Sequence, residues 1–142
     1  MILFDANILL YAYDARSVPH AACRRFLEET MSAPAPSALC WQSIIAFLRI
    51  GTNARVFTHA ISRREASTIV SAWLAHPSVV VLEPGERFWQ ILNNLINDAQ
   101  VSGPLMTDAA LAALAIEHGA TLCTTDRDFA RFSALRTIDP TR

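Results

Sequence analysis

The chain has 142 residues, 52% of them hydrophobic, which suffices for one ordinary domain with a continuous core but not for two domains. Its formal net charge is −1, so the overall charge does not indicate the basic surface that many nucleic-acid-binding proteins carry. All twelve basic residues are arginines, which excludes any mechanism that requires a catalytic lysine.

The sequence indicates a soluble, cytoplasmic protein that has no contact with a membrane. The apolar opening, MILFDANILLYAY, has no basic residue ahead of it and contains Asp5, so it differs from a secretion signal. No other stretch approaches the roughly 18 apolar residues of a membrane-spanning helix. The three cysteines form no CxxC motif and are expected to be reduced and buried. The four scattered histidines form no zinc-binding pattern.

In the first half of the chain, short apolar runs alternate with helical patterns. The expected elements are a buried strand at residues 2–4, a helical turn at 7–13, a helix opened by Pro19, a strand at 38–39 and a helix from Trp41. In the last of these helices, apolar residues recur at positions i, i+3, i+4 and i+7, which is the spacing of one helix face.

The second half repeats this alternation. The expected elements are a helix with a capping box at Ser62–Glu65, a strand at 78–82, a helix at 88–99, a helix from Thr107 closed by Gly119, a strand at 121–124 and an edge strand at 136–138. The run at 78–82, SVVVL, is β-branched and uninterrupted, so it is expected to be buried on both faces.

Strands that alternate with helices predict the α/β class, with one domain over residues 1–142. The expected architecture is a three-layer α/β/α sandwich with a central, mainly parallel sheet. In such sheets, ligands bind beyond the carboxyl ends of the strands. Asp5 and the pair Asp126 and Asp128 follow two of these strands, while Asp108 lies at a helix N-terminus. The four acids are therefore expected to converge on one rim.

Each aspartate taken singly has a structural explanation as well. Asp108 suits a helix N-cap or a partner of the helix dipole. Asp126 and Asp128 suit a turn. Asp5 is harder to explain in this way, because a carboxylate at the end of a buried strand is partly desolvated and needs a partner. No arginine lies close to Asp5 in the sequence.

The joint interpretation of the acids is a metal site. Carboxylates about 4 Å apart repel by roughly 4 kcal/mol at an effective dielectric constant of 20, so a cluster must take up protons or bind a cation. An oxygen-only cluster favours Mg²⁺ or Mn²⁺ over zinc. Asp5, Asp108 and Asp126 are the expected ligands, and Asp128 completes the site or orients water. Such an ion supports phosphodiester hydrolysis without a nucleophilic side chain.

With these residues identified, the chain resembles the PIN-domain family, specifically the VapC-type toxins of bacterial toxin–antitoxin pairs. The matching segments are FDANILLYAY, WQSIIAFLRIGTNARVF, MTDAALAALAIEHGATL and TTDRDFARFSALRTIDP. The resemblance implies a Mg²⁺- or Mn²⁺-dependent endoribonuclease that forms a homodimer and is inhibited by a cognate antitoxin. It matches the family acids to Asp5, Asp108, Asp126 and Asp128, with Asn7 and Thr124 as supporting polar residues.

One position departs from the family pattern. The family commonly carries a glutamate on the helix after the second strand, where this chain has Ala46, three residues before Arg49. Without that carboxylate, we expect one well-bound ion, or a second that arrives with the RNA phosphate. Arg49 and Arg127 are candidate contacts to RNA phosphate, although surface ion pairs would explain them equally well.

Two alternative functions are open, and the sequence favours one of them over the other. A phosphoacceptor receiver domain also gathers acids at the edge of a parallel sheet, but those domains rely on a lysine, which this chain lacks. The stronger alternative is a catalytically degenerate module that binds RNA or an antitoxin, and Ala46 is the feature that favours it. The identity of the RNA is not encoded in any readable motif.

Overall fold

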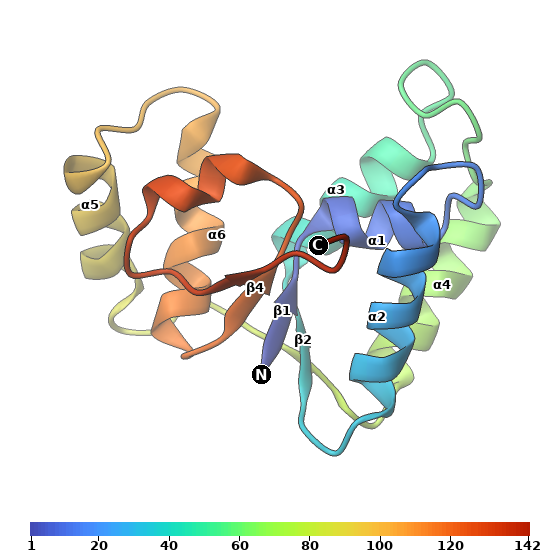
Figure 1. Ribbon diagram of the computed structural model, residues 1–142, viewed down its shortest axis with the longest axis horizontal. Helices are drawn as coiled ribbons and strands as arrows, with labels where there is room; N and C mark the ends of the chain where they lie inside the picture. Colours follow the sequence, from blue (N-terminus) through green and yellow to red (C-terminus); the bar gives the residue numbers. More distant parts are fainter.

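Five short parallel strands form the centre of the computed structural model, which describes residues 1–142 (Figure 1). The strands are β1 (Ile2–Phe4), β2 (Ser37–Leu39), β3 (Val79–Val81), β4 (Thr121–Cys123) and β5 (Thr137–Ile138). They are arranged in the order β3-β2-β1-β4-β5, and every neighbouring pair is parallel. Together with the helices on its two faces, this sheet confirms the predicted α/β sandwich.

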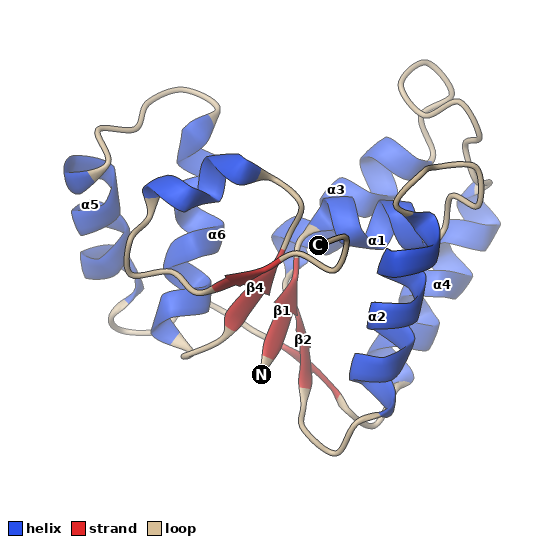
Figure 2. Ribbon diagram, in the orientation of Figure 1, coloured by secondary structure: helices blue, strands red, loops and turns tan.

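The helices cover the two faces of the sheet unequally (Figure 2). One side carries α1 (Ala6–Ala12), α2 (His20–Ser32), α3 (Trp41–Gly51) and α4 (Arg63–Ala75), and the other carries α5 (Phe88–Asp98) and α6 (Leu105–Glu117). A short 3₁₀ helix, η1 (Arg127–Arg131), follows β4. None of the helices combines the length and apolar character needed to cross a bilayer.

The sheet divides the interior into two cores, and the alternation of side chains along β1 shows how. Leu3 packs with residues of α5 and α6, whereas Phe4, its neighbour in sequence, packs with residues of α1 to α4. Successive side chains of a strand point to opposite faces of a sheet, so a central strand must be apolar at every position. The ILF run meets this requirement, and the side chains of Leu3 and Phe4 are fully buried.

The expectation that residues 78–82 are buried on both faces is wrong. Strand β3 lies at the edge of the sheet and pairs only with β2, and Val80 is 38% exposed. A run of valines favours extended backbone wherever it lies, so the sequence predicts the strand but not its position in the sheet. The expected edge strand at 136–138 is present as β5.

The three cysteines are unpaired and buried, as expected. Burial raises the pKa of the Cys23 thiol to about 11, and it also raises the pKa of Cys123. A raised thiol pKa leaves little thiolate at neutral pH. The cysteines therefore belong to the hydrophobic core, where they pack as small apolar residues.

Helix α6 ends at a glycine in the left-handed conformation, which yields a stability prediction. Gly119 has φ of +66°, and a Cβ added there would meet no atom within 4 Å. Gly119→Ala should therefore destabilise the protein by about 1 kcal/mol through backbone strain alone. Gly119→Asn should cost less, because asparagine tolerates this conformation. Urea unfolding measures both variants, and an alanine variant as stable as the wild type would contradict the backbone argument.

Candidate active site

The four predicted acids come from three segments that meet at the carboxyl edge of the sheet. Asp5 follows β1 and caps α1, with its carboxylate accepting the Ala6 N–H at 2.7 Å. Asp126 and Asp128 follow β4, the neighbour of β1 in the sheet. Asp108 lies in the first turn of α6. Parallel strands end at the same edge, which places the residues that follow them close together.

Three of these acids form a close cluster. Each of Asp108, Asp126 and Asp128 has a carboxylate oxygen within 4.8 Å of such an oxygen in the other two. Asp5 does not belong to this group. We name Asp108, Asp126 and Asp128 the carboxylate triad. At these distances the negative charges repel by several kcal/mol unless protons or a cation compensate them.

Thr124 connects Asp5 to the segment that carries two members of the triad. Its hydroxyl donates a hydrogen bond to Asp5 Oδ2 at 2.7 Å. Thr124 Oγ1 itself accepts hydrogen bonds from Asn7 Nδ2 at 3.2 Å and from the backbone N–H of Asp126 at 3.0 Å. Thr124 is only 4% exposed, so the residue at the centre of this network is shielded from water. The Asp5 carboxylate is thereby held in one orientation against β4.

Burial and neighbouring negative charges raise the pKa of two of the acids, Asp5 and Asp108. Desolvation raises the pKa of Asp5, while the hydrogen bonds from Thr124 and Ala6 oppose the increase and the charge of Asp126 adds to it. Desolvation also raises the pKa of Asp108, and the negative charges of Asp126, Asp5 and Asp128 raise it further. Acids whose pKa is perturbed both by burial and by neighbouring charges are typical of functional sites.

The structural explanations considered for the acids hold only in part. Asp108 is not the N-cap of α6, because the helix begins at Leu105, two residues before the expected start, and Pro104 takes the cap position. Asp126 does shape a turn, since its Oδ1 accepts the Asp128 N–H at 2.9 Å at the start of η1. Asp126 thus has a local structural role in addition to its place in the triad.

An arginine that the sequence did not single out contacts the triad. Arg131 Nε donates to the backbone oxygen of Asp128 at 2.9 Å, and its guanidinium lies 3.5 Å from Asp128 Oδ1. Desolvation and the neighbouring acids raise the pKa of Asp108, and the positive charge of Arg131 opposes part of this increase. The spacing of Asp128 and Arg131, three residues apart in a segment after a strand, is the signal that could have revealed this pair.

The two predicted phosphate-contacting arginines occupy different positions. Arg49 is exposed on α3 and forms no ion pair. It lies seven residues after Gln42. The Gln42 amide donates a hydrogen bond at 2.9 Å to the backbone oxygen of Thr107, the residue that precedes Asp108. Residues spaced i, i+4 and i+7 share a helix face, so Ala46 and Arg49 lie on the face of α3 that Gln42 directs toward the start of α6.

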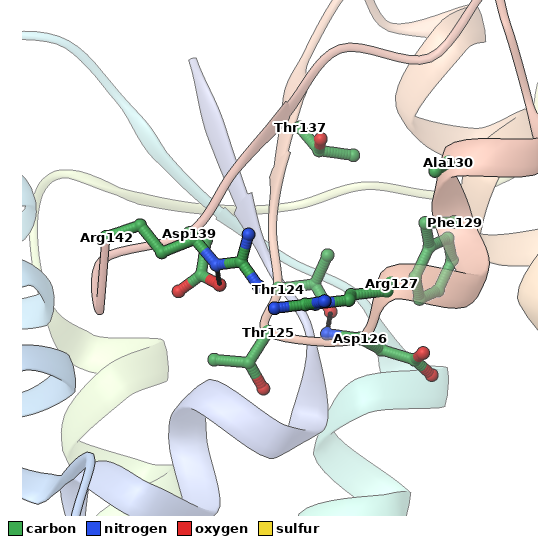
Figure 3. Close-up of a pocket in the computed structure, with 9 residues that line it drawn as sticks. All are labelled: Thr124, Thr125, Asp126, Arg127, Phe129, Ala130, Thr137, Asp139 and Arg142. Atoms are coloured by element: carbon green, nitrogen blue, oxygen red, sulfur yellow. Dashed lines mark hydrogen bonds and ion pairs between the residues drawn. The ribbon is translucent and has the colours of Figure 1, made fainter.

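The Arg127 side chain points away from the carboxylate of Asp126, a member of the triad (Figure 3). It is exposed, forms no ion pair, and lines a cavity of about 320 Å³ together with Thr124 and Asp126 (Figure 3). The Asp126 carboxylate points away from Asp139 and Arg142, whereas Arg127 extends toward them (Figure 3). The ion-pair explanation is therefore wrong for Arg127, as it is for Arg49.

Residues 2–135 match the family model described as the PIN domain. The chain belongs to the PIN-domain family. Ribonuclease VapC43 of Mycobacterium tuberculosis is 40% identical over 140 residues, which cover 99% of this chain and 95% of that protein. Ribonuclease VapC37 of the same species is 36% identical over 140 residues, covering 99% and 97% of the two chains. Within the PIN-domain family, the chain thus resembles VapC proteins over nearly its whole length.

Several solved structures share the fold at low sequence identity. VapBC2 from Rickettsia felis, bound to a promoter DNA fragment, includes a chain that matches with a TM-score of 0.73 at 16% identity, covering 98% of both chains. VapC20 of Mycobacterium tuberculosis, described as a toxin that cleaves the sarcin-ricin loop, matches with a TM-score of 0.67 at 17% identity, covering 92% and 93%. These likenesses support the architecture derived above.

The residues of this PIN domain fit a hard divalent cation. The triad and Asp5 supply only carboxylate oxygens, which Mg²⁺ and Mn²⁺ prefer, and no histidine or cysteine joins the cluster. In addition, Asn7 Oδ1 is buried and has no hydrogen-bond partner. Buried polar atoms without partners are costly, and an acceptor beside the Asp5 network suits a water molecule held by such a cation.

Proposed function

We propose that this protein is a divalent-metal-dependent endoribonuclease and the toxic component of a toxin–antitoxin pair. The observation that carries the proposal is the carboxylate triad, three carboxylates with oxygens within 4.8 Å of one another, beside the partly desolvated Asp5. The names of the curated relatives, ribonucleases VapC43 and VapC37, support RNA as the substrate. Their full-length similarity supports the same reaction here.

In this proposal Asp5, Asp108 and Asp126 hold Mg²⁺ or Mn²⁺, and Asp128 orients the attacking water. A divalent ion supplies charge stabilisation to a phosphodiester and makes water acidic enough to attack at neutral pH. Thr124 and Asn7 hold the Asp5 carboxylate in place, and Arg131 holds the more exposed Asp128 through two contacts. Because residue 46 is alanine, we propose a single well-bound ion.

Arg49 and Arg127 serve this reaction as contacts to the RNA backbone. Both guanidinium groups are free of ion pairs, so neither must give up a carboxylate partner to bind phosphate. They belong to two separate segments, Arg49 to α3 and Arg127 to η1, directly after Asp126. An RNA strand bound at the triad would thus have two separate segments of the chain that can supply positive charge to its backbone.

The proposed partners are a cognate antitoxin and a second copy of the chain. Similar folds occur in structures described as VapBC-1 from Haemophilus influenzae and as a toxin–antitoxin complex from Klebsiella pneumoniae. The large apolar side chains of Trp41 and Ile45 on α3, with Trp89 on α5, are 47%, 54% and 65% exposed, which supports a homodimer surface. Three unpaired cysteines are consistent with a cytoplasmic protein.

Metal removal tests the reaction directly. Purified protein should cleave RNA in Mg²⁺ or Mn²⁺, lose the activity in EDTA, and recover it when Mn²⁺ is added in excess over the chelator. A preparation of Asp5→Asn made in the same way controls for contaminating nucleases, since any cleavage it shows is not due to this site. Equal cleavage by both preparations with and without EDTA would refute the metal role.

The second candidate function is a catalytically degenerate module that binds RNA or an antitoxin. The observation that favours it is that residue 46 is alanine, so the face of α3 directed toward α6 has no carboxylate at this position. Calorimetric titration with Mn²⁺ distinguishes the two functions. The nuclease should bind about one ion per chain with loss of binding in Asp108→Asn, whereas a pure binding module should release or absorb no heat.

A further inference from the structure

Two adjoining cavities form a groove behind the loop that carries Asp126. The first, of about 320 Å³, is lined by residues of the β4–η1 segment and by Thr137, Asp139 and Arg142. The second, of about 400 Å³, is lined by Tyr11, Val18, Pro19, Ala22, Thr125 and Thr141. Thr125 lines both cavities, and Thr141 of the second is next to Arg142 of the first. Each cavity is within the size range of a small-ligand site.

The uncompensated charge in this groove is positive. Arg127 lines it and forms no ion pair, while the Asp126 carboxylate is directed to the other side of the loop (Figure 3). Asp139 is the remaining acid, and its charge is already engaged. Its Oδ2 lies 3.4 Å from Arg142 Nε, and its Oδ1 accepts the backbone N–H and the hydroxyl of Thr141 at 2.9 and 2.6 Å.

Asp139 also fixes the position of Arg142. The Asp139 side chain is only 21% exposed, so it anchors the final turn of the chain, whereas the Arg142 side chain is 57% exposed. The guanidinium therefore keeps donors free for a further partner, since a single ion-pair contact uses one of its five N–H groups. Figure 3 shows Arg127 and Arg142 reaching into the same region from two segments of the chain.

The rest of the lining combines an aromatic ring with hydroxyl groups. Tyr11 is partly exposed, and its backbone is tied to the start of α2 by the hydrogen bond between its oxygen and His20 Nδ1 at 2.8 Å. Thr125, Thr137 and Thr141 add hydroxyl groups. Guanidinium groups for phosphate, a ring on which a base can stack and hydroxyls for base edges together suit a single-stranded nucleic acid.

We propose that this groove binds the nucleotides next to the cleaved phosphodiester, so that the RNA strand continues from the carboxylate triad past Arg127 and Arg142 to Tyr11. The inference rests on the proposed nuclease function and adds where the strand runs. Asp126 connects the two regions, because it belongs to the carboxylate triad and also lines the groove. One phosphate lies at the triad, a neighbouring phosphate contacts Arg127 and Arg142, and a base stacks on Tyr11.

Binding measurements in an inactive background test the groove separately from catalysis. In Asp5→Asn protein, fluorescence anisotropy with a labelled single-stranded oligoribonucleotide should show affinity about 5- to 10-fold weaker for Arg127→Ala and for Arg142→Ala. Each should also reduce the slope of log affinity against log salt by about 0.7, the value for one phosphate contact on a single strand. Arg64→Ala is the matched control, an exposed arginine of α4 that lines neither cavity.

Photocrosslinking provides a second measurement that does not depend on arginine variants. An oligoribonucleotide with 5-iodouridine should crosslink to Tyr11, as identified by mass spectrometry of the digested protein. The groove is overturned if Arg127→Ala and Arg142→Ala bind RNA as tightly as Arg64→Ala, or if the crosslinks map to other surfaces. If the protein also shows EDTA-sensitive cleavage, such a result would refute the groove but not the nuclease function. If the arginine variants bind RNA more weakly but the protein cleaves RNA under no condition, the groove would be supported and the nuclease function refuted.

Discussion

Replacing Asp108 with asparagine should reduce RNA cleavage at least about 100-fold and, at the same time, stabilise the metal-free protein. The first effect follows because Asp108 is a member of the carboxylate triad, and preorganised charged groups in a site commonly contribute factors of about 10² to 10³. The second follows because Asp108 is repelled by Asp126, Asp5 and Asp128. Asparagine keeps the shape of the side chain and removes the repulsion.

The gain in stability should depend on pH with a definite sign. The pKa of Asp108 is raised in the folded protein above its ordinary value of 3.8, mainly by desolvation, so the folded state binds the proton more tightly than the unfolded state. The wild type therefore loses stability as the pH rises from about 3.8 through the folded pKa. Asp108→Asn should match the wild type at low pH and exceed it at neutral pH.

Thermal unfolding in EDTA measures this difference. Because Asp108 is partly exposed, we expect a gain on the order of 1 kcal/mol, which corresponds to a rise in Tm of about 2–4 °C for a chain of this size. Added Mn²⁺ should stabilise the wild type more than the variant. Glu86→Gln, an exposed acid outside the cluster, serves as the control and should change neither Tm nor cleavage. A less stable Asp108→Asn at neutral pH would contradict the repulsion argument.

Replacing Thr124 with valine should weaken cleavage about 10- to 100-fold although the residue holds no metal in our proposal. Valine has nearly the same shape but lacks the hydroxyl that orders Asp5, Asn7 and the Asp126 backbone. Losses of this size are typical when a group that orients a metal ligand is removed. Because buried groups then lack partners, the protein should also lose about 1–3 kcal/mol of stability.

The pH profile distinguishes this positioning role from a general loss of stability. The hydrogen bond from Thr124 lowers the pKa of Asp5 against the larger effect of desolvation. Without it, the pKa of Asp5 rises further, so cleavage by Thr124→Val should fail at a higher pH than in the wild type. Thr124→Ser should restore the profile, and Thr121→Val, at the start of β4, should leave it unchanged. An unshifted acidic limb in Thr124→Val would exclude the role.

The alternation of strands and helices could be predicted from the sequence because both periodicities are local. A buried strand such as ILF and a helix face with apolar residues at i, i+3 and i+4 are each visible within a few residues. Element boundaries were less certain, as the start of α6 at Leu105 shows. The place of each strand in the sheet was not predictable in this way. The valine run of β3, for example, was expected to be buried on both faces but lies at an edge of the sheet.

In the candidate site as well, residue types could be predicted from the sequence, whereas the contacts between them could not. Aspartates after strands and at a helix start were visible as residue types, and oxygen ligands alone determine which ions fit. The sequence did not show that Asp108, Asp126 and Asp128 form the close group while Asp5 stands beside it, held by Thr124. Nor did it single out Arg131 or Gln42, whose contacts depend on how a side chain is directed after folding.

The sequence by itself determined the α/β class, the oxygen-only chemistry and the absence of a lysine, because composition and short-range periodicity contain that information. Only the tertiary structure decided that β1 lies between β2 and β4, and hence that Asp5 and Thr124, 119 positions apart in the chain, share a hydrogen bond. Strand order is set by packing between residues far apart in the sequence. The contacts they form offset the entropy cost of closing a long loop, and these contacts are not visible in any local sequence pattern.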